Sequence, residues 1–301
     1  MPLTFDTAFT PAYGEAVPVA KDVLRLTVNN PGPFTFYGTN SYVVGRDTLA
    51  VIDPGPDDDA QLNALVKAIA GRPVSHIFVT HTHRDHSPLT PRLKDLTGAT
   101  IVAEGGHRAA RPLRIGEVNP LDASADTDFS PDIVIRDNEA VAGDGWSLRA
   151  IYTPGHTANH AAFALEGTGV LFSGDHVMAW STSIVAPPDG SMRDYMNSLD
   201  RLLERDDTLY LSGHGAALEN PTPFVAGLRD HRIGREKAIL QRLEAGDRTI
   251  QDIVRAVYKD TDPRLHGAAG LSVLAHVEDL VGRGLVAAEG DVALDGFYSV
   301  A

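Results

Sequence analysis

Histidine and aspartate side chains are crowded in the segment THTHRDHSPLT, residues 80–90. His81 and His83 are two residues apart, so in an extended or turning segment they point the same way and can hold one ion. Asp85 and His86 follow where the chain turns, and they can face a second ion. Catalytic zinc prefers imidazole and carboxylate ligands with one position left for water. The segment therefore predicts a metal site, and a solvated surface turn is the weaker alternative.

Other polar residues that suit the same chemistry come later and earlier in the chain. His156 lies in TPGH, Asp175 in FSGD and His214 in SGHG, and each would be a weak signal by itself. A carboxylate such as Asp175 can bridge two ions, and two ions can share a hydroxide that attacks a substrate. Asp53 in VIDPG is expected to orient a ligand from behind. His160, in HTANH, is a candidate proton donor to the leaving group, and a structural histidine is an equal alternative.

Apolar segments must position these side chains, and each candidate ligand follows such a segment. Helical spacing predicts a helix through Leu62, Leu65 and Ile69, which Gly71 and Pro73 end. Three strands are predicted at residues 42–44, 49–52 and 77–79. Further strands are predicted in the segments ATIVAE, WSLRAIY and DTLYLS, and a hairpin is predicted in HAAFALEGTGVLFSGD. Sites form outside strand ends, where loops from several strands converge. We therefore expect the candidate ligands to share one rim of the fold.

The chain changes character after Pro221. Three segments have helical periodicity: HRIGREKAILQRLEAG, TIQDIVRAVY and LSVLAHVEDLVGRG. The segment LVAAEGDVALDGFYSV follows them and is predicted to form a hairpin with a turn near Gly290. This order is the outline of a winged helix. His107, His231 and His266 are interpreted as solvated or structural residues.

Composition limits the classes of function. The 301 residues include 26 basic and 40 acidic side chains, a net charge of -14, which weighs against unspecific nucleic-acid binding. The chain has no cysteine, so any transition metal must be held by imidazole and carboxylate. Neither a signal peptide nor a membrane-spanning stretch is predicted. The expected compartment is the cytoplasm, without a membrane partner.

The motifs THTHRDH, TPGHTANH, FSGD and SGHG, in this order, resemble the metal motifs of the metallo-β-lactamase superfamily over residues 20–220. The resemblance implies an α/β fold, the αβ/βα sandwich, with a C-terminal winged-helix-like domain. It also implies that two zinc ions are bound, one by His81, His83 and His156, the other by Asp85, His86 and His214, with Asp175 between them and Asp53 beneath. Iron or manganese is an alternative to zinc. Pro88 and Leu89 stand where many members have two glycines, so this loop is expected to be stiffer.

A closer likeness involves GTNSYVVG, DYMNSLDRLL, HRIGREKAIL and the C-terminal tail. These segments resemble the β-lactamase-like protein 2 subfamily, which includes a mitochondrial endoribonuclease for single-stranded RNA and bacterial members of unsettled substrate. The expected domains are a catalytic domain of the metallo-β-lactamase fold at residues 1–225 and a winged-helix-like domain at residues 226–301.

The resulting hypothesis is a hydrolase in which a metal-bound hydroxide, held in line by Asp85, cleaves a phosphodiester, with single-stranded RNA as the substrate. The alternative is a thioesterase, esterase or lactonase of the glyoxalase II type. Because Asp175 stands at the bridging position, a true β-lactamase is not expected. A winged-helix regulator with a degenerate enzyme domain is the alternative from another class. Its presumed recognition helix carries Glu278 and Asp279 with only Arg283 as a positive charge, so duplex DNA is an unlikely partner. A homo-oligomer is left open.

Overall fold

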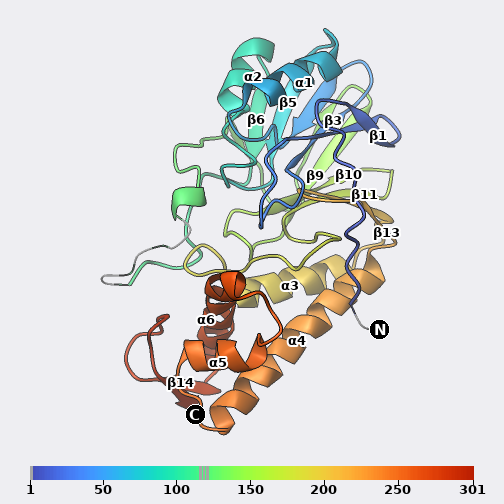
Figure 1. Ribbon diagram of the computed structural model, residues 1–301. Helices are drawn as coiled ribbons and strands as arrows, with labels where there is room; N and C mark the ends of the chain where they lie inside the picture. The colour runs from blue at the N-terminus through green and yellow to red at the C-terminus, as the bar shows by residue number, and fades with distance from the viewer. Residues whose placement is uncertain (1–2, 115–116, 118, 120–121) are drawn as a thin grey trace.

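Two β-sheets face one another in the computed structural model, which describes residues 3–114, 117, 119 and 122–301 (Figure 1). In the described part the first sheet has the strand order β1 (Val17–Ala20), β2 (Val23–Thr27), β3 (Asn40–Val44), β4 (Leu49–Ile52), β5 (Val74–Val79), β6 (Thr100–Ala103), β7 (Ile133–Val134). The second sheet has the order β13 (Leu218–Glu219), β12 (Leu209–Ser212), β11 (Val170–Gly174), β10 (Ala161–Leu165), β9 (Trp146–Tyr152), β8 (Ala140–Gly143).

The strands predicted from apolar runs are confirmed, and they end where the candidate ligands begin. β5 stops at Val79, directly before the histidine cluster, and pairs in parallel with β4 and β6. β10 and β11 form the expected antiparallel hairpin, and β12 pairs in parallel with β11. The carboxyl ends of β5, β11 and β12 therefore point to one edge of the sandwich. The sequence did not lead us to predict β1, β2, β7, β8 or β13.

Apolar side chains from both sheets fill the space between them. Tyr42 and Phe78 of the first sheet meet Phe172 and Phe163 of the second, with ring centroids 5.1 Å apart in both pairs. Each of these side chains is buried, and aromatic pairs of this geometry add to the free energy gained from apolar burial. This shared core fixes the two sheets, and with them the strand ends that carry the ligands.

Helices cover the outer face of each sheet. α1 (Asp59–Ile69) and α2 (Thr90–Thr97) lie on the first sheet, and α3 (Met192–Leu203) lies with the start of α4 (Thr222–Glu244) on the second (Figure 1). α1 is the helix predicted from its spacing; Asp58 caps it by accepting a hydrogen bond from the Gln61 amide. The αβ/βα sandwich is thus confirmed.

The C-terminal region has its own apolar core. It contains the end of α4, α5 (Ile250–Val257), the 3-10 turn η2 (Pro263–Leu265), α6 (His266–Gly282) and the hairpin of β14 (Val286–Ala288) and β15 (Tyr298–Val300). A further 3-10 turn, η1 (Asp122–Ser124), precedes β7. Three helices and a hairpin are the predicted winged-helix outline. The boundary expected at residue 225 falls within α4, which continues unbroken through both regions, and that boundary stays a prediction.

Ion pairs join α6 to the sandwich. Glu278 pairs with Arg111 at 2.6 Å, and Asp279 pairs with Arg193 at 2.8 Å. These are the acidic side chains of the presumed recognition helix, so in this fold they attach the C-terminal region to the catalytic region. In the described residues, no helix is long and apolar enough to cross a membrane.

Candidate metal centre

His81, His83 and His156 converge at the edge where β5 and β9 end. The Nδ1 atom of His83 lies 3.1 Å from Nε2 of His81 and 3.0 Å from Nε2 of His156. Burial, together with the neighbouring His156, lowers the pKa of His83 to about 3. The pKa of His81 is also held well below its ordinary value, first by burial. Three neutral imidazoles therefore direct nitrogen atoms at a common point, as ligands of one ion do.

Asp85, His86 and His214 form a second group beside the first. Nε2 of His86 and Nε2 of His214 each lie 3.3 Å from Oδ2 of Asp85. Burial alone would raise the pKa of Asp85, but His86 and His214 hold it well below its ordinary value. Burial would lower the pKa of His214, whereas Asp175 and Asp85 together raise it to about 10. A metal ion bound here would displace the protons from the imidazole nitrogens that face Asp85.

Asp175 lies between the two groups. Its Oδ2 atom is 4.0 Å from Nε2 of His81, 3.8 Å from Nε2 of His156 and 3.3 Å from Nε2 of His214, and its Oδ1 atom is 3.5 Å from Nε2 of His86. A carboxylate in this position would be able to bridge two metal ions. Gly213 permits it, because a Cβ atom there would lie 2.3 Å from Oδ1 of Asp175.

Asp53 lies directly beneath this cluster, where the sequence reading placed it. It accepts hydrogen bonds from the Thr80 amide and the Thr80 hydroxyl, both at 2.7 Å, and contacts Nδ1 of His86 at 3.0 Å. A carboxylate behind a histidine fixes the proton on Nδ1 and leaves Nε2 free for a metal. Asp53 thereby sets the tautomer and orientation of His86.

Backbone carbonyls orient two of the other imidazoles. Nδ1 of His156 lies 2.7 Å from the Ile184 carbonyl, and Nδ1 of His214 lies 3.2 Å from the Gly38 carbonyl. In both rings Nδ1 therefore carries the proton and Nε2 faces the cluster. The hydroxyl of Thr39 donates to Oδ2 of Asp85 at 2.9 Å, and the side chain of Asp85 remains 25% exposed.

His160 lies under the cluster rather than at its open side. It is 1% exposed, with Nδ1 2.8 Å from the Thr153 hydroxyl. Its Nε2 accepts a hydrogen bond from the Asp175 amide at 3.1 Å. Both ring nitrogens are thus engaged, Nδ1 with the Thr153 hydroxyl and Nε2 with the backbone of Asp175. This arrangement favours the structural alternative over a proton donor, and a catalytic role for His160 has no geometric support here.

The donor set fits two metal ions. Nε2 of His86 and Oδ1 of Asp175, which face the cluster, are buried and have no hydrogen-bond partner. The ligand atoms form three groups, each within 4.8 Å: His81, His83 and His156; His81, His86 and Asp175; Asp85, His86 and His214. The structure thus brings together all seven side chains that the motifs and the family resemblance selected. Because the site is intact, the alternative of a degenerate enzyme domain is wrong.

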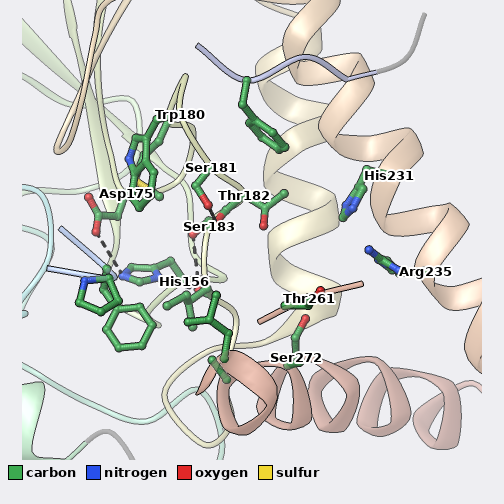
Figure 2. A pocket seen from close by; sticks show the side chains of 18 of the residues that line it. His156, Asp175, Trp180, Ser181, Thr182, Ser183, His231, Arg235, Thr261 and Ser272 are labelled. Atoms are coloured by element: carbon green, nitrogen blue, oxygen red, sulfur yellow. Dashed lines mark hydrogen bonds and ion pairs between the residues drawn. The ribbon is translucent and has the colours of Figure 1, made fainter. Parts of the chain in front are cut away.

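A cavity of about 320 Å³ opens beside the cluster. Its walls come from both regions of the fold: Phe5, Pro33, Phe34, His156, Asp175, residues 178 and 180–184, then His231, Arg232, Arg235, Tyr258, Thr261, Leu265, Ala268, Ala269 and Ser272. Figure 2 shows Asp175 and His156 on one side and His231 and Arg235 on the other. The C-terminal region therefore forms a wall of this cavity.

The sequence reading missed several residues of the site. Thr39 and Thr80 position acidic side chains, and the only signal for them was their place beside a strand end. His231 was interpreted as solvated or structural, yet it lines the cavity. Arg232 and Arg235 were read only as part of a helix, since nothing local indicates which face of that helix meets the metal cluster.

Comparison with known proteins agrees with this geometry. The family model described as "Metallo-beta-lactamase superfamily" matches residues 34–214, and the model "Beta-lactamase associated winged helix domain" matches residues 249–295. The Drosophila melanogaster protein "Beta-lactamase-like protein 2 homolog" is 29% identical over 272 residues, 87% of this chain and 88% of that protein. An "Atrochrysone carboxyl ACP thioesterase" from Passalora fulva is 31% identical over 250 residues, 78% of this chain and 68% of that protein.

Two solved structures share the whole architecture. A beta-lactamase domain protein from Burkholderia ambifaria has a TM-score of 0.78 at 24% identity and covers 97% of this chain and 95% of its own. A metallo-beta-lactamase family protein from Thermus thermophilus has a TM-score of 0.74 at 24% identity, with 93% and 99% coverage. With its intact histidine and aspartate site, the chain belongs to the metallo-beta-lactamase superfamily as a metal-dependent hydrolase that carries the associated winged helix domain.

Proposed function

We propose that this hydrolase cleaves the thioester of a small acyl group carried on a pantetheine-like thiol. The observation that carries the proposal is the cavity of about 320 Å³ between the metal cluster and the C-terminal region. Pockets for small molecules span roughly 300–1,000 Å³ and are mostly apolar with a few polar groups. The walls here fit that description, with aromatic and aliphatic side chains beside the hydroxyls of Ser181, Thr182 and Thr261.

The chemistry of the leaving group supports a thioester. Water adds to the carbonyl carbon, the C–S bond breaks, and the products are a carboxylic acid and a thiol. A thiolate leaves without much help, since a free thiol has a pKa of about 8.5. A ribose alkoxide is far more basic and needs a proton donor, and His160 has both ring nitrogens engaged.

The side chains of the cluster have distinct tasks. His81, His83, His156, Asp85, His86, His214 and Asp175 would hold the two ions. Such ions lower the pKa of bound water to roughly 7 and polarise a carbonyl oxygen. Asp85, ionised and partly exposed, is placed to accept a hydrogen bond from the attacking water and so orient it, while Thr39 fixes one of its oxygens. Trp180, stacked on Phe36 with ring centroids 4.6 Å apart, forms part of the cavity wall.

The relatives lend further support. Proteins from Passalora fulva and Aspergillus chevalieri are named atrochrysone carboxyl ACP thioesterases, at 31% and 26% identity over 78% and 85% of this chain. Cleavage of single-stranded RNA stays a prediction. Two features weigh against it: the small volume of the cavity, and a net charge of -14 where single-strand binding uses a positively charged groove.

A substrate panel on zinc-loaded, metal-analysed protein tests the proposal. It comprises butyryl-N-acetylcysteamine, S-lactoylglutathione, a lactone, bis(p-nitrophenyl) phosphate, single-stranded RNA and a β-lactam. We expect the highest kcat/KM with the acyl thioesters. Asp175→Ala should abolish this activity, whereas Asp95→Ala, which removes an exposed carboxylate on α2, should not change it. RNA cleavage that depends on Asp175, without thioester hydrolysis, would overturn the proposal.

A further inference from the structure

Two arginines of α4 lie at the cavity without a counter-ion. Arg232 donates to the Ser183 carbonyl and to the Ser272 hydroxyl, and Arg235 donates to the Val257 carbonyl at 3.0 Å. All of these partners are uncharged. Among the described residues, no carboxylate forms an ion pair with either guanidinium, although most other arginines of the chain have one.

Burial makes this arrangement costly. Arg232 is 3% exposed, and its Nε atom, like Nε of Arg235 and Nδ1 of His231, is buried without a hydrogen-bond partner. A buried charge is normally paired, since its transfer from water costs far more free energy than that of a neutral group. None of these three nitrogen atoms has an acceptor among the described residues. An anion in the cavity would supply both the charge and the hydrogen bonds.

The charge of the cavity wall is opposite to that of the protein. Among the described residues that line the cavity, Asp175 is the only carboxylate, and it belongs to the metal cluster. Burial and the neighbouring Arg232 lower the pKa of His231 to about 4, so the positive charge at neutral pH is that of the two guanidiniums. Leu265 and Ala268, at the start of α6, also line the cavity, and the dipole of that helix adds positive potential.

Both guanidiniums are held in place before any ligand binds. Arg235 lies over the ring of Tyr258, 4.5 Å from its centroid, and Arg232 lies over Tyr195, 5.2 Å from its centroid. A fixed guanidinium loses little side-chain entropy on binding, and its planar donors match the geometry of carboxylate and phosphate. Figure 2 places Arg235 across the cavity from Asp175, so the ligand would span the distance between cation and metal cluster.

We propose that Arg232 and Arg235 form a subsite for an anionic group, a carboxylate or a phosphate, on the molecule whose reacting bond lies at the metal cluster. That the reacting bond is a thioester rests on the proposed function, whereas the anion subsite is inferred from the contacts of Arg232 and Arg235 alone. The anionic group has two possible sources. It is either a carboxylate at the end of the acyl chain or the phosphate of a phosphopantetheine thiol.

The first test compares matched substrates. Glutaryl- and pentanoyl-N-acetylcysteamine differ by a terminal carboxylate, and acetyl-phosphopantetheine and acetyl-pantetheine differ by a phosphate. The wild type should have the higher kcat/KM with the anionic member of one pair. That pair identifies whether the anionic group is the carboxylate of the acyl chain or the phosphate of the thiol. Arg235→Met should lower that kcat/KM ratio roughly 10-fold or more, the range for a hydrogen bond to a charged group. Lys237→Met, an equal loss of charge at an exposed position of α4, should keep the ratio.

Arg235 is the better position to change, because Arg232 also supports Ser183 and packs on Tyr195, so that its replacement could unfold the protein.

The second test measures binding instead of turnover. Calorimetry on zinc-loaded protein compares glutarate with pentanoate, and phosphopantetheine with pantetheine. Glutarate and pentanoate share one carboxylate, and phosphopantetheine and pantetheine share the thiol. The free energy of binding that this shared group gains at the metals is therefore the same for both members of a pair.

The binding test separates the two proposals. The subsite is supported if the wild type prefers an anionic ligand, Arg235→Met loses this preference and Lys237→Met keeps it. This holds even if no thioester is hydrolysed, and in that case only the thioesterase proposal fails. If wild-type protein binds both members of each pair equally, or if the preference survives in Arg235→Met, the subsite assignment is overturned whatever the enzyme hydrolyses.

Discussion

Replacement of Asp53 by asparagine should weaken one metal site without disturbing the fold. Asp53 contacts Nδ1 of His86 at 3.0 Å and accepts two hydrogen bonds from Thr80. Asparagine keeps an acceptor for the Thr80 amide, and it tolerates the left-handed backbone found here, with φ of 48°. Its amide group, however, turns a donor toward His86 or loses a contact with Thr80. The tautomer that leaves Nε2 of His86 free for metal is then disfavoured.

The expected magnitude follows from this single contact. Loss of a carboxylate behind a metal-binding histidine typically weakens metal affinity about 10- to 100-fold, which is roughly 1.4 to 2.7 kcal/mol. The ion held by Asp85, His86 and His214 should bear most of this loss, because Asp53 contacts His86 directly. The ion held by His81, His83 and His156 is linked to Asp53 only through the Thr80 hydroxyl, which lies 3.0 Å from Nδ1 of His81.

Competition with a zinc chelator measures both affinities. Asp58→Asn is the matched control, because it makes the same chemical change on α1, where asparagine caps a helix as well as aspartate does. Activity of Asp53→Asn should fall at limiting zinc and return in excess zinc. Unchanged binding of both ions in a variant whose metal-free melting temperature matches that of the wild type would refute the reasoning.

Four further outcomes are expected. Protein expressed with added zinc should contain close to two metal ions per chain by elemental analysis, and at most one tightly bound ion would count against the binuclear site. Asp175→Ala should lose one ion together with hydrolysis, and the natural protein should turn over a β-lactam negligibly; efficient β-lactam hydrolysis would contradict this. A chain ending near Pro221 should lose activity or solubility, because it exposes the cavity and the face of α3 that α4 covers; a soluble, fully active product would show that the tail has neither role. The Arg111 guanidinium lowers the pKa of Glu117 from 4.5 to about 2. Because the pKa of Glu117 is lower in the folded than in the unfolded protein, ionised Glu117 stabilises the fold above pH 4.5, and this stabilisation should be lost as the pH falls towards 2. Thermal melting at several pH values should show a smaller pH-dependent loss in Arg111→Met, in which only the contacts with Arg114 remain.

Local patterns were sufficient to find the candidate metal ligands that the fold brings together. His81, His83, Asp85 and His86 are close in sequence, and His156, Asp175 and His214 each follow an apolar strand. Strand ends are readable because side-chain periodicity is a local property, and parallel neighbours carry their ends to the same edge of a sheet. The family resemblance, carried by the same motifs, supplied the assignment of ligands to two ions.

Other features depended on how distant segments pack. His160 lies four residues after a ligand, yet its partners Thr153 and the Asp175 amide occupy its nitrogens, and no spacing rule reveals this. Arg232 and Arg235 meet the cavity only because α4 runs unbroken from the second sheet into the C-terminal core. Tertiary packing decides which face of a helix meets a site built from other segments, since helical periodicity specifies an apolar stripe but not its partner. The sequence by itself therefore determined the metal chemistry, and the tertiary structure decided the shape and charge of the space where the substrate must fit.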